Sequence, residues 1–151
     1  MKNQFKILKE NRILILKLIE NCSIEQLNKI PEGFKNNIAW NIAHLLVTQQ
    51  LLCYQLSNLP LNISDKLVEL YQKGTSPKSD ISKEEFEKIK VQFIEIPNQF
   101  DTDFNIGIFK TYNEYKTSVN VNLSDINSAI EFNNFHEGIH LGYILALKKL
   151  I

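Results

Sequence analysis

Four stretches of the chain carry apolar residues at the three- and four-residue spacing of an amphipathic helix. In residues 4–20 one broad stripe is apolar and most charged residues fall elsewhere, which predicts a helix with a wide buried face. Residues 37–56 are apolar over most of the circumference, which is typical of a central helix or of one that a second subunit covers. Residues 82–100 and 124–151 repeat the helical pattern, and we expect Pro97 to end or kink the third helix.

Polar residues mark the starts of several helices. Segments 23–26 and 82–85 both match a capping box, in which a serine is followed three residues later by Gln or Glu. The first of them predicts an additional short helix over residues 24–29. For the last helix we expect Ser124 as the N-cap and Asp125 in the first turn, where an acidic residue is favoured by the helix dipole.

The stretch before the last helix reads as a long loop. Residues 101–121 mix polar and aromatic side chains around Gly107, with short extended pieces expected at 106–109 and 118–122. Loops of this length in compact domains are more often functional or lid-like than idle. A short apolar piece at 67–71 completes the pattern. Four long helices without convincing strands predict an all-α fold, a four-helix bundle with an extra short helix and a long loop before the last helix.

Size and composition narrow the class of protein. A chain of 151 residues is expected to form one domain, 1–151, which buries roughly 70% of its unfolded surface. The 17 basic and 17 acidic residues cancel and form no basic patch, which argues against nucleic acid or an anionic membrane as a partner. Cys22 and Cys53 fit neither a disulfide framework nor a metal knuckle. The polar N-terminus and the absence of a long apolar run lead us to expect a cytoplasmic protein.

The three histidines of the chain are its candidate functional residues. His136 and His140 lie four residues apart on the last helix, so that their Cβ atoms share a face at roughly 5–6 Å. His44 lies in the middle of the helix over 37–56 and also faces inward. A buried imidazole without a partner loses roughly 1–3 kcal/mol of hydration, and a shared ion removes that cost. We therefore predict that His44, His136 and His140 bind one divalent metal ion.

Three neutral nitrogens suit Zn²⁺, Ni²⁺ or Fe²⁺ and leave positions open for water or substrate. An open site is typical of catalysis, whereas a structural zinc normally has four protein ligands. Each ring also needs a neighbour that fixes its tautomer. The candidates for that role are polar residues about one turn from a histidine: Asn41, Thr48, Asn133 and Tyr143. Such residues are also common at helix interfaces without any role in a site.

Residues 136–140 also match H-E-x-x-H, the zinc motif of metalloproteases in which the glutamate is the general base. The peptidase families supply a third ligand downstream of this motif. Only eleven residues follow His140, and none of them is His, Asp or Glu. The third ligand must come from upstream, which points away from a peptidase. Glu137 falls about 80° from the midpoint of the two ligands, at the rim of the site, where it is either a catalytic base or an outward, solvated carboxylate.

Two segments carry a resemblance to a known family. Asn36–His44, followed by Thr48-Gln49-Gln50, and the closing segment Phe135–Ile144 resemble the DinB superfamily of DinB/YfiT-like metalloenzymes. The resemblance implies a four-helix bundle with unusual connectivity, often a homodimer. It also implies a metal triad of one histidine on the second long helix and an HxxxH pair on the last, which corresponds to His44, His136 and His140. Family members with assigned activities include S-transferases that use low-molecular-weight thiols and a thiol-dependent isomerase.

Two classes of function follow. In the first, the protein is a metal-dependent transferase or hydrolase that activates a small thiol or water for attack on a small electrophilic substrate. A low-molecular-weight thiol would be the cosubstrate, and Glu137 would assist proton transfer. In the alternative, the metal is structural or vestigial and the protein is a dimeric, non-catalytic binding or stress-response module.

Overall fold

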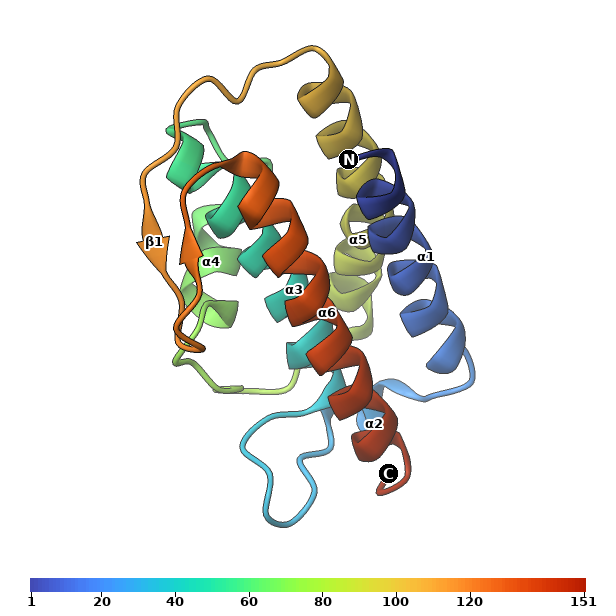
Figure 1. Cartoon of the computed structure of the whole chain (residues 1–151). Coiled ribbons are helices and arrows are strands. Elements are labelled where there is room, and N and C mark those ends of the chain that lie inside the picture. Colours follow the sequence, from blue (N-terminus) through green and yellow to red (C-terminus); the bar gives the residue numbers. More distant parts are fainter.

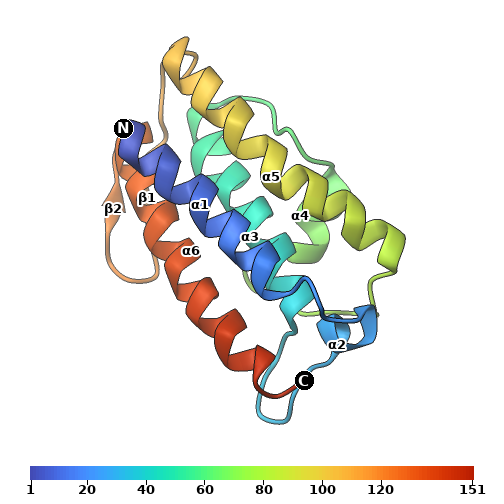
Figure 2. The same ribbon diagram turned by 90° about the vertical axis from the view of Figure 1, so that its right-hand side faces the viewer.

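The computed structural model describes all residues, 1–151, and shows an all-α architecture (Figure 1). The long helices are α1 (Lys2–Leu18), α3 (Ile38–Cys53), α5 (Lys83–Asn105) and α6 (Ile126–Lys148). The short elements are α2 (Ile24–Asn28), the 3₁₀ helix η1 (Gln55–Ser57), α4 (Asp65–Tyr71), β1 (Tyr115–Lys116) and β2 (Asn122–Leu123). The four long helices lie side by side with their axes roughly aligned (Figure 2). The predicted helical bundle is confirmed.

Helix α3 lies at the centre of the bundle. It packs against α6 and α5, and α4 and α2 also contact it, while α1 packs against α5 and α6 on the other side. Every residue of α3 except Thr48 and Leu51 is buried. This burial explains why its sequence is apolar on nearly all sides, because no face of the helix is left for water. Of the two explanations for that pattern, a central position in the chain's own fold is the one observed.

The proline in α5 does not end that helix. Pro97 is buried, and α5 continues for two further turns to Asn105, so the expected end near residue 100 is wrong. A proline inside a helix leaves the carbonyl four residues earlier without its usual N–H donor. Here that carbonyl belongs to Phe93, and it accepts a hydrogen bond of 3.1 Å from Nη1 of Arg12 on α1. A tertiary contact therefore takes the place of the missing helical bond.

The connection between α5 and α6 contains a small hairpin. Strands β1 and β2 pair antiparallel with Tyr115 opposite Leu123, and Asn120 turns the chain with a φ of 65°. The expected extended piece at 106–109 is not a strand, because α5 extends to its edge. The N-cap of α6 is one residue later than expected, because the side chain of Asp125 accepts from the backbone N–H of Ser128 at 2.8 Å.

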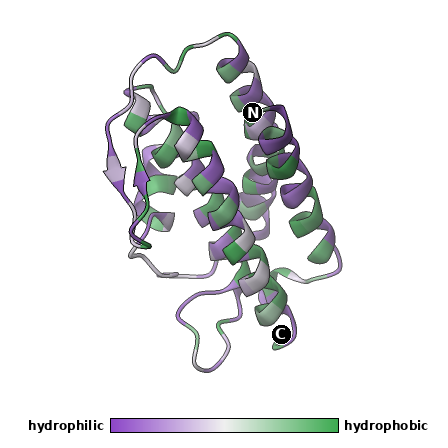
Figure 3. Cartoon of the chain, in the orientation of Figure 1, coloured by the Kyte–Doolittle hydropathy of each residue, from purple (hydrophilic) through white to green (hydrophobic).

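Helix α6 buries only some of its apolar residues. Ile130, Ile144 and Leu147 face the core and are buried, whereas Phe135 and Ile139 are 54% and 50% exposed. Hydrophobic and hydrophilic residues are therefore interleaved around α6 (Figure 3). No helix of the protein combines the length and apolar character that crossing a membrane requires.

Candidate metal centre

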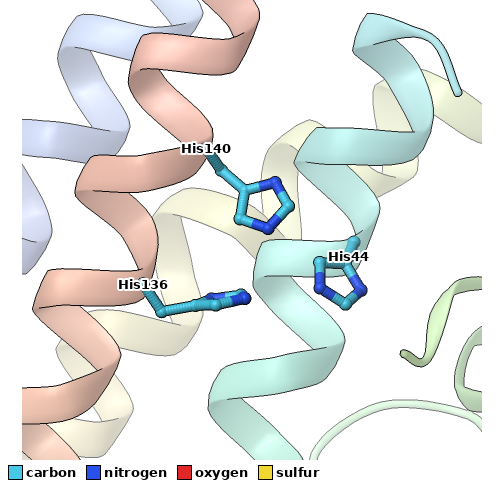
Figure 4. A group of neighbouring side chains, drawn as sticks. All are labelled: His44, His136 and His140. Atoms are coloured by element: carbon cyan, nitrogen blue, oxygen red, sulfur yellow. The ribbon is translucent and has the colours of Figure 1, made fainter. Parts of the chain in front are cut away.

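The packing of α6 on α3 brings the three histidines together. His44 projects from α3, and His136 and His140 project from consecutive turns of α6 toward it (Figure 4). The nitrogen atoms they offer all lie within 4.8 Å of one another. The ring centroids are 4.5 Å apart for His136 and His140, and 4.9 and 5.3 Å apart for His44 with His140 and His136. Residues almost a hundred positions apart in sequence thus face one point.

The ring of His44 is fixed by a carbonyl at the end of α4. Its Nδ1 lies 2.7 Å from the backbone oxygen of Tyr71. A carbonyl only accepts, so Nδ1 carries the proton and Nε2 is left unprotonated, with its lone pair available as an acceptor or metal ligand. The hydroxyl of Thr48 lies 3.2 Å from that Nε2. The indole of Trp40 stacks on the ring at a centroid distance of 4.6 Å and an angle of 10°, and donates through Nε1 to Thr75.

The ring of His140 is fixed from the opposite helix. Its Nδ1 lies 2.7 Å from Oδ1 of Asn41 on α3. The Nδ2 group of the same amide donates to the backbone oxygen of Asn37 at 2.7 Å, which sets the orientation of the amide. Because Oδ1 only accepts, Nδ1 of His140 carries the proton and its Nε2 is free. Asn41 was expected as a neighbour of His44 on its own helix, but its hydrogen bond goes to His140.

The ring of His136 has a nitrogen atom without a hydrogen-bond partner. Nδ1 of His136 is buried and makes no hydrogen bond. Leaving a buried polar atom without a partner is costly, and native proteins do so rarely. Together with the unprotonated Nε2 atoms of His44 and His140, this donor set fits a divalent ion of the Zn²⁺, Ni²⁺ or Fe²⁺ type, which takes neutral imidazole ligands.

The electrostatics keep these rings in the form that a metal needs. Burial, with smaller contributions from the neighbouring His140 and His44, lowers the pKa of His136 to about 3. Burial, with the help of His44, lowers the pKa of His140 to about 4. The pKa of His44 is also lowered by burial, against the opposing effect of the Tyr71 carbonyl. All three imidazoles are therefore neutral at neutral pH, with lone pairs available for coordination.

The carboxylate of Glu137 lies away from the histidine cluster. Its side chain is 1% exposed and forms an ion pair with Arg12 of α1, whose side chain is fully buried. Oε1 accepts from Nε and Nη2 of Arg12 at 3.0 and 2.8 Å, and Oε2 accepts from Asn11 at 3.2 Å. The carboxylate is not among the groups clustered with the histidines. Both expected placements, at the rim of the site and in solvent, are wrong, because α1 packs over this side of α6.

The sequence contains a signal for the partner of Glu137. Arg12 continues the three- and four-residue spacing of Phe5, Leu8 and Ile15, which are the other buried residues of α1. A charged residue on the apolar stripe of a helix requires a buried counter-ion. If Arg12 is taken as part of that stripe, the sequence predicts that an acidic residue is buried beside it. The sequence does not say which acidic residue this is.

Two further expected neighbours of the histidines have other contacts. Nδ2 of Asn133 lies 3.4 Å from Oε1 of Glu137, so it extends the ion pair. Tyr143 is 36% exposed, and its ring packs edge-on against Phe34 at a centroid distance of 5.4 Å. Neither makes a hydrogen bond to a histidine. The sequence did not indicate two backbone carbonyls: that of Tyr71, which bonds to the His44 ring, and that of Asn37, which accepts from the Asn41 amide.

Comparison with known proteins identifies the family of the chain. A family model described as the DinB superfamily matches residues 7–144, a range that contains all three histidines. No curated protein matches the chain. The family match covers most of the sequence, and the fold and the histidine cluster are compatible with a metal-binding protein. The chain belongs to the DinB superfamily.

Proposed function

We propose that the protein is a metal-dependent enzyme that activates a small thiol or a water molecule for attack on a small electrophilic substrate. The single observation that carries the proposal is the donor set at the cluster of His44, His136 and His140. Two of these rings have their tautomers fixed with Nε2 unprotonated, and the third holds a buried nitrogen without a partner. No carboxylate belongs to the cluster, so the ligands are neutral.

A divalent ion held by three neutral ligands keeps its full charge and would lower the pKa of a thiol or of water. The chain itself orients the ligands: the Tyr71 carbonyl and the Asn41 amide hold the N–H groups of His44 and His140. The Trp40 indole covers one face of His44 and excludes water there. Thiol activation gives S-transfer and water activation gives hydrolysis. Glu137 takes no part in this proposal, because Arg12 and Asn11 occupy its carboxylate.

Elemental analysis of protein purified without an affinity tag tests the proposal. We expect about one zinc, nickel or iron per chain in the wild type and close to none in His136→Ala. Asn134→Ala is the control on the same helix, because the Asn134 side chain bonds to Gln4 instead. The loaded protein is then incubated with small thiols and model electrophiles. Unchanged metal content in His136→Ala would refute the site, and metal binding without any thiol or hydrolytic activity would refute the enzyme.

The same histidines connect α3 to α6, which favours a structural metal as the second candidate. In that case the protein is a non-catalytic binding module. Thermal unfolding with and without a chelator distinguishes the two. Loss of the folded state on chelation indicates a structural ion, whereas a folded but inactive apo-protein indicates a catalytic one.

We also propose that the protein is a homodimer that pairs through the outer face of α6. Phe135, Ile139 and Tyr143 lie on successive turns of this face and are 54%, 50% and 36% exposed. Large apolar side chains gathered on one exposed stripe are typical of an interface. Gly138 and Gly142 accompany them and have open space where a side chain would be, which permits close approach of a second helix.

A further inference from the structure

A cavity of about 710 Å³ lies between α4, α5 and the connection that joins them. Its volume falls in the range of small-molecule sites, about 300–1,000 Å³. None of the three histidines lines it, so it is distinct from the metal centre. Its apolar wall comes from α3, α4, α5 and the connection between α4 and α5: Trp40, Leu67, Leu70, Tyr71, Ile81 and Ile89.

The cavity nevertheless shares a wall with the metal centre. Trp40 lines it and stacks on His44 at 4.6 Å. Tyr71 lines it, and its carbonyl holds Nδ1 of His44. Asn37 also lines it, and its carbonyl holds the amide of Asn41, which in turn holds His140. A molecule in the cavity would therefore touch the groups that orient two of the three rings.

The charges around the cavity select against a strongly charged occupant. Three lysines and two acidic residues line it. Lys66 pairs with Glu85 at 3.7 Å, and Lys88 pairs at 2.6 Å with Glu84 outside the lining. Lys78 and Asp80 remain, one of each sign. With the charges so nearly balanced, burial of apolar surface is the main source of affinity.

We propose that this cavity binds a neutral, largely apolar small molecule, and that its occupancy alters metal affinity at the histidines. Binding in the cavity is independent of the proposed function, whereas the coupling to metal rests on it. Coupling follows because a ligand that shifts Trp40, Tyr71 or Asn37 shifts the groups that fix His44 and His140. By thermodynamic linkage, bound metal changes the affinity of the cavity for its ligand by the same factor.

N-phenyl-1-naphthylamine is a suitable probe, and 8-anilinonaphthalene-1-sulfonate shares its ring system but carries a sulfonate. Trp40 is the only tryptophan of the chain and lines the cavity, so bound probe should quench its fluorescence by energy transfer. In chelator-treated protein we expect saturable one-to-one binding of the neutral probe, and affinity at least about tenfold weaker for the sulfonate. Tighter binding of the sulfonate, or no saturable binding of either probe, would overturn the site.

Val91→Glu and Val119→Glu form a matched pair of variants. The two valines are 54% and 50% exposed, so neither substitution disturbs the core. Val91 lines the cavity, whereas Val119 lies in the hairpin between β1 and β2. Val91→Glu should weaken the neutral probe at least about tenfold, and Val119→Glu should leave it unchanged. Equal effects of the two substitutions would show that the probe binds elsewhere and would overturn the proposal.

The coupling is tested by titrating Zn²⁺ into apo-protein with and without saturating N-phenyl-1-naphthylamine. We expect the zinc affinity to change by about fivefold or more, and the probe affinity to change by the same factor when zinc is present. Unchanged zinc affinity with the probe bound would refute the coupling and leave the cavity site standing. Absence of zinc binding in both conditions would instead refute the proposed function.

Discussion

The ion pair between Arg12 and Glu137 gives the sharpest prediction for stability. Both side chains are shielded from water, with 0% and 1% exposed. Replacing Glu137 by Gln removes the negative charge and leaves the guanidinium buried without a counter-ion. Breaking a buried pair in this way costs about 3–5 kcal/mol. That is a large part of the roughly 5–15 kcal/mol by which a domain of this size is stable, so Glu137→Gln should be severely destabilised.

A second variant separates the charge from the packing. Replacing Arg12 by Met and Glu137 by Leu together removes both buried charges while keeping most of the volume, a change that is often neutral or stabilising. The double variant still leaves the Phe93 carbonyl without its donor, which costs about 1–3 kcal/mol. Adding Pro97→Ala restores an N–H at the position that can serve that carbonyl. Stability should therefore rise in the order single, double, triple variant.

Urea unfolding followed by far-UV circular dichroism measures these differences at an unchanged m-value. Glu84→Gln is the matched control, because Glu84 pairs with Lys88 at 2.6 Å on the surface, where the side chains are 80% and 69% exposed. That pair is screened by solvent, so its loss should leave the urea midpoint unchanged. A Glu137→Gln variant as stable as Glu84→Gln would refute the buried ion pair, and a double variant no better than the single one would refute the charge argument.

Three further predictions concern the site and the surface. Asn41→Ala should weaken zinc binding about 10–100-fold, measured by competition with a chromophoric chelator, since it frees the His140 ring; an unchanged affinity would leave Asn41 a packing role only. Because burial lowers the pKa of His136 to about 3 and of His140 to about 4, below the ordinary 6.5, the unfolded chain binds protons that the folded metal-free protein does not. Its unfolding free energy should therefore fall as the pH drops from about 6.5 toward 4, by on the order of 1 kcal/mol per pH unit for each histidine. Urea midpoints that stay level over that window would contradict this. Ile139→Lys should convert the proposed dimer to a monomer in sedimentation velocity, because it places a charge on the exposed stripe of α6, whereas an unaltered sedimentation coefficient would move the interface elsewhere.

Local sequence patterns predict the helices well and their ends less well. Capping boxes at 23–26 and 82–85 are both present in the structure, because a cap needs only residues within one turn of each other. Pro97 was expected to end or kink the third long helix for the same local reason, and the helix does not end there. The compensating donor, Arg12, lies 81 residues away from the Phe93 carbonyl. A helix break that tertiary structure repairs cannot be recognised from the helix alone.

Local sequence patterns also could not predict which side of α6 faces the core. Phe135 and Ile139 are as apolar as Ile130 and Ile144, so periodicity finds two competing stripes on one helix. The choice between them depends on the direction from which α1 and α3 approach. The same choice turned Glu137 toward Arg12 and left Tyr143 near the surface.

Helical periodicity and one-turn spacing are local properties, so they were enough to predict the class of fold and the three histidines that can share an ion. The groups that hold those rings depend on how the helices pack. The carbonyl of Tyr71, the amide of Asn41 and the indole of Trp40 reach the site from other turns and helices. The packing also directs Glu137 away from the histidines. A buried carboxylate needs a cation beside it, and the packing of α1 on α6 places Arg12 there.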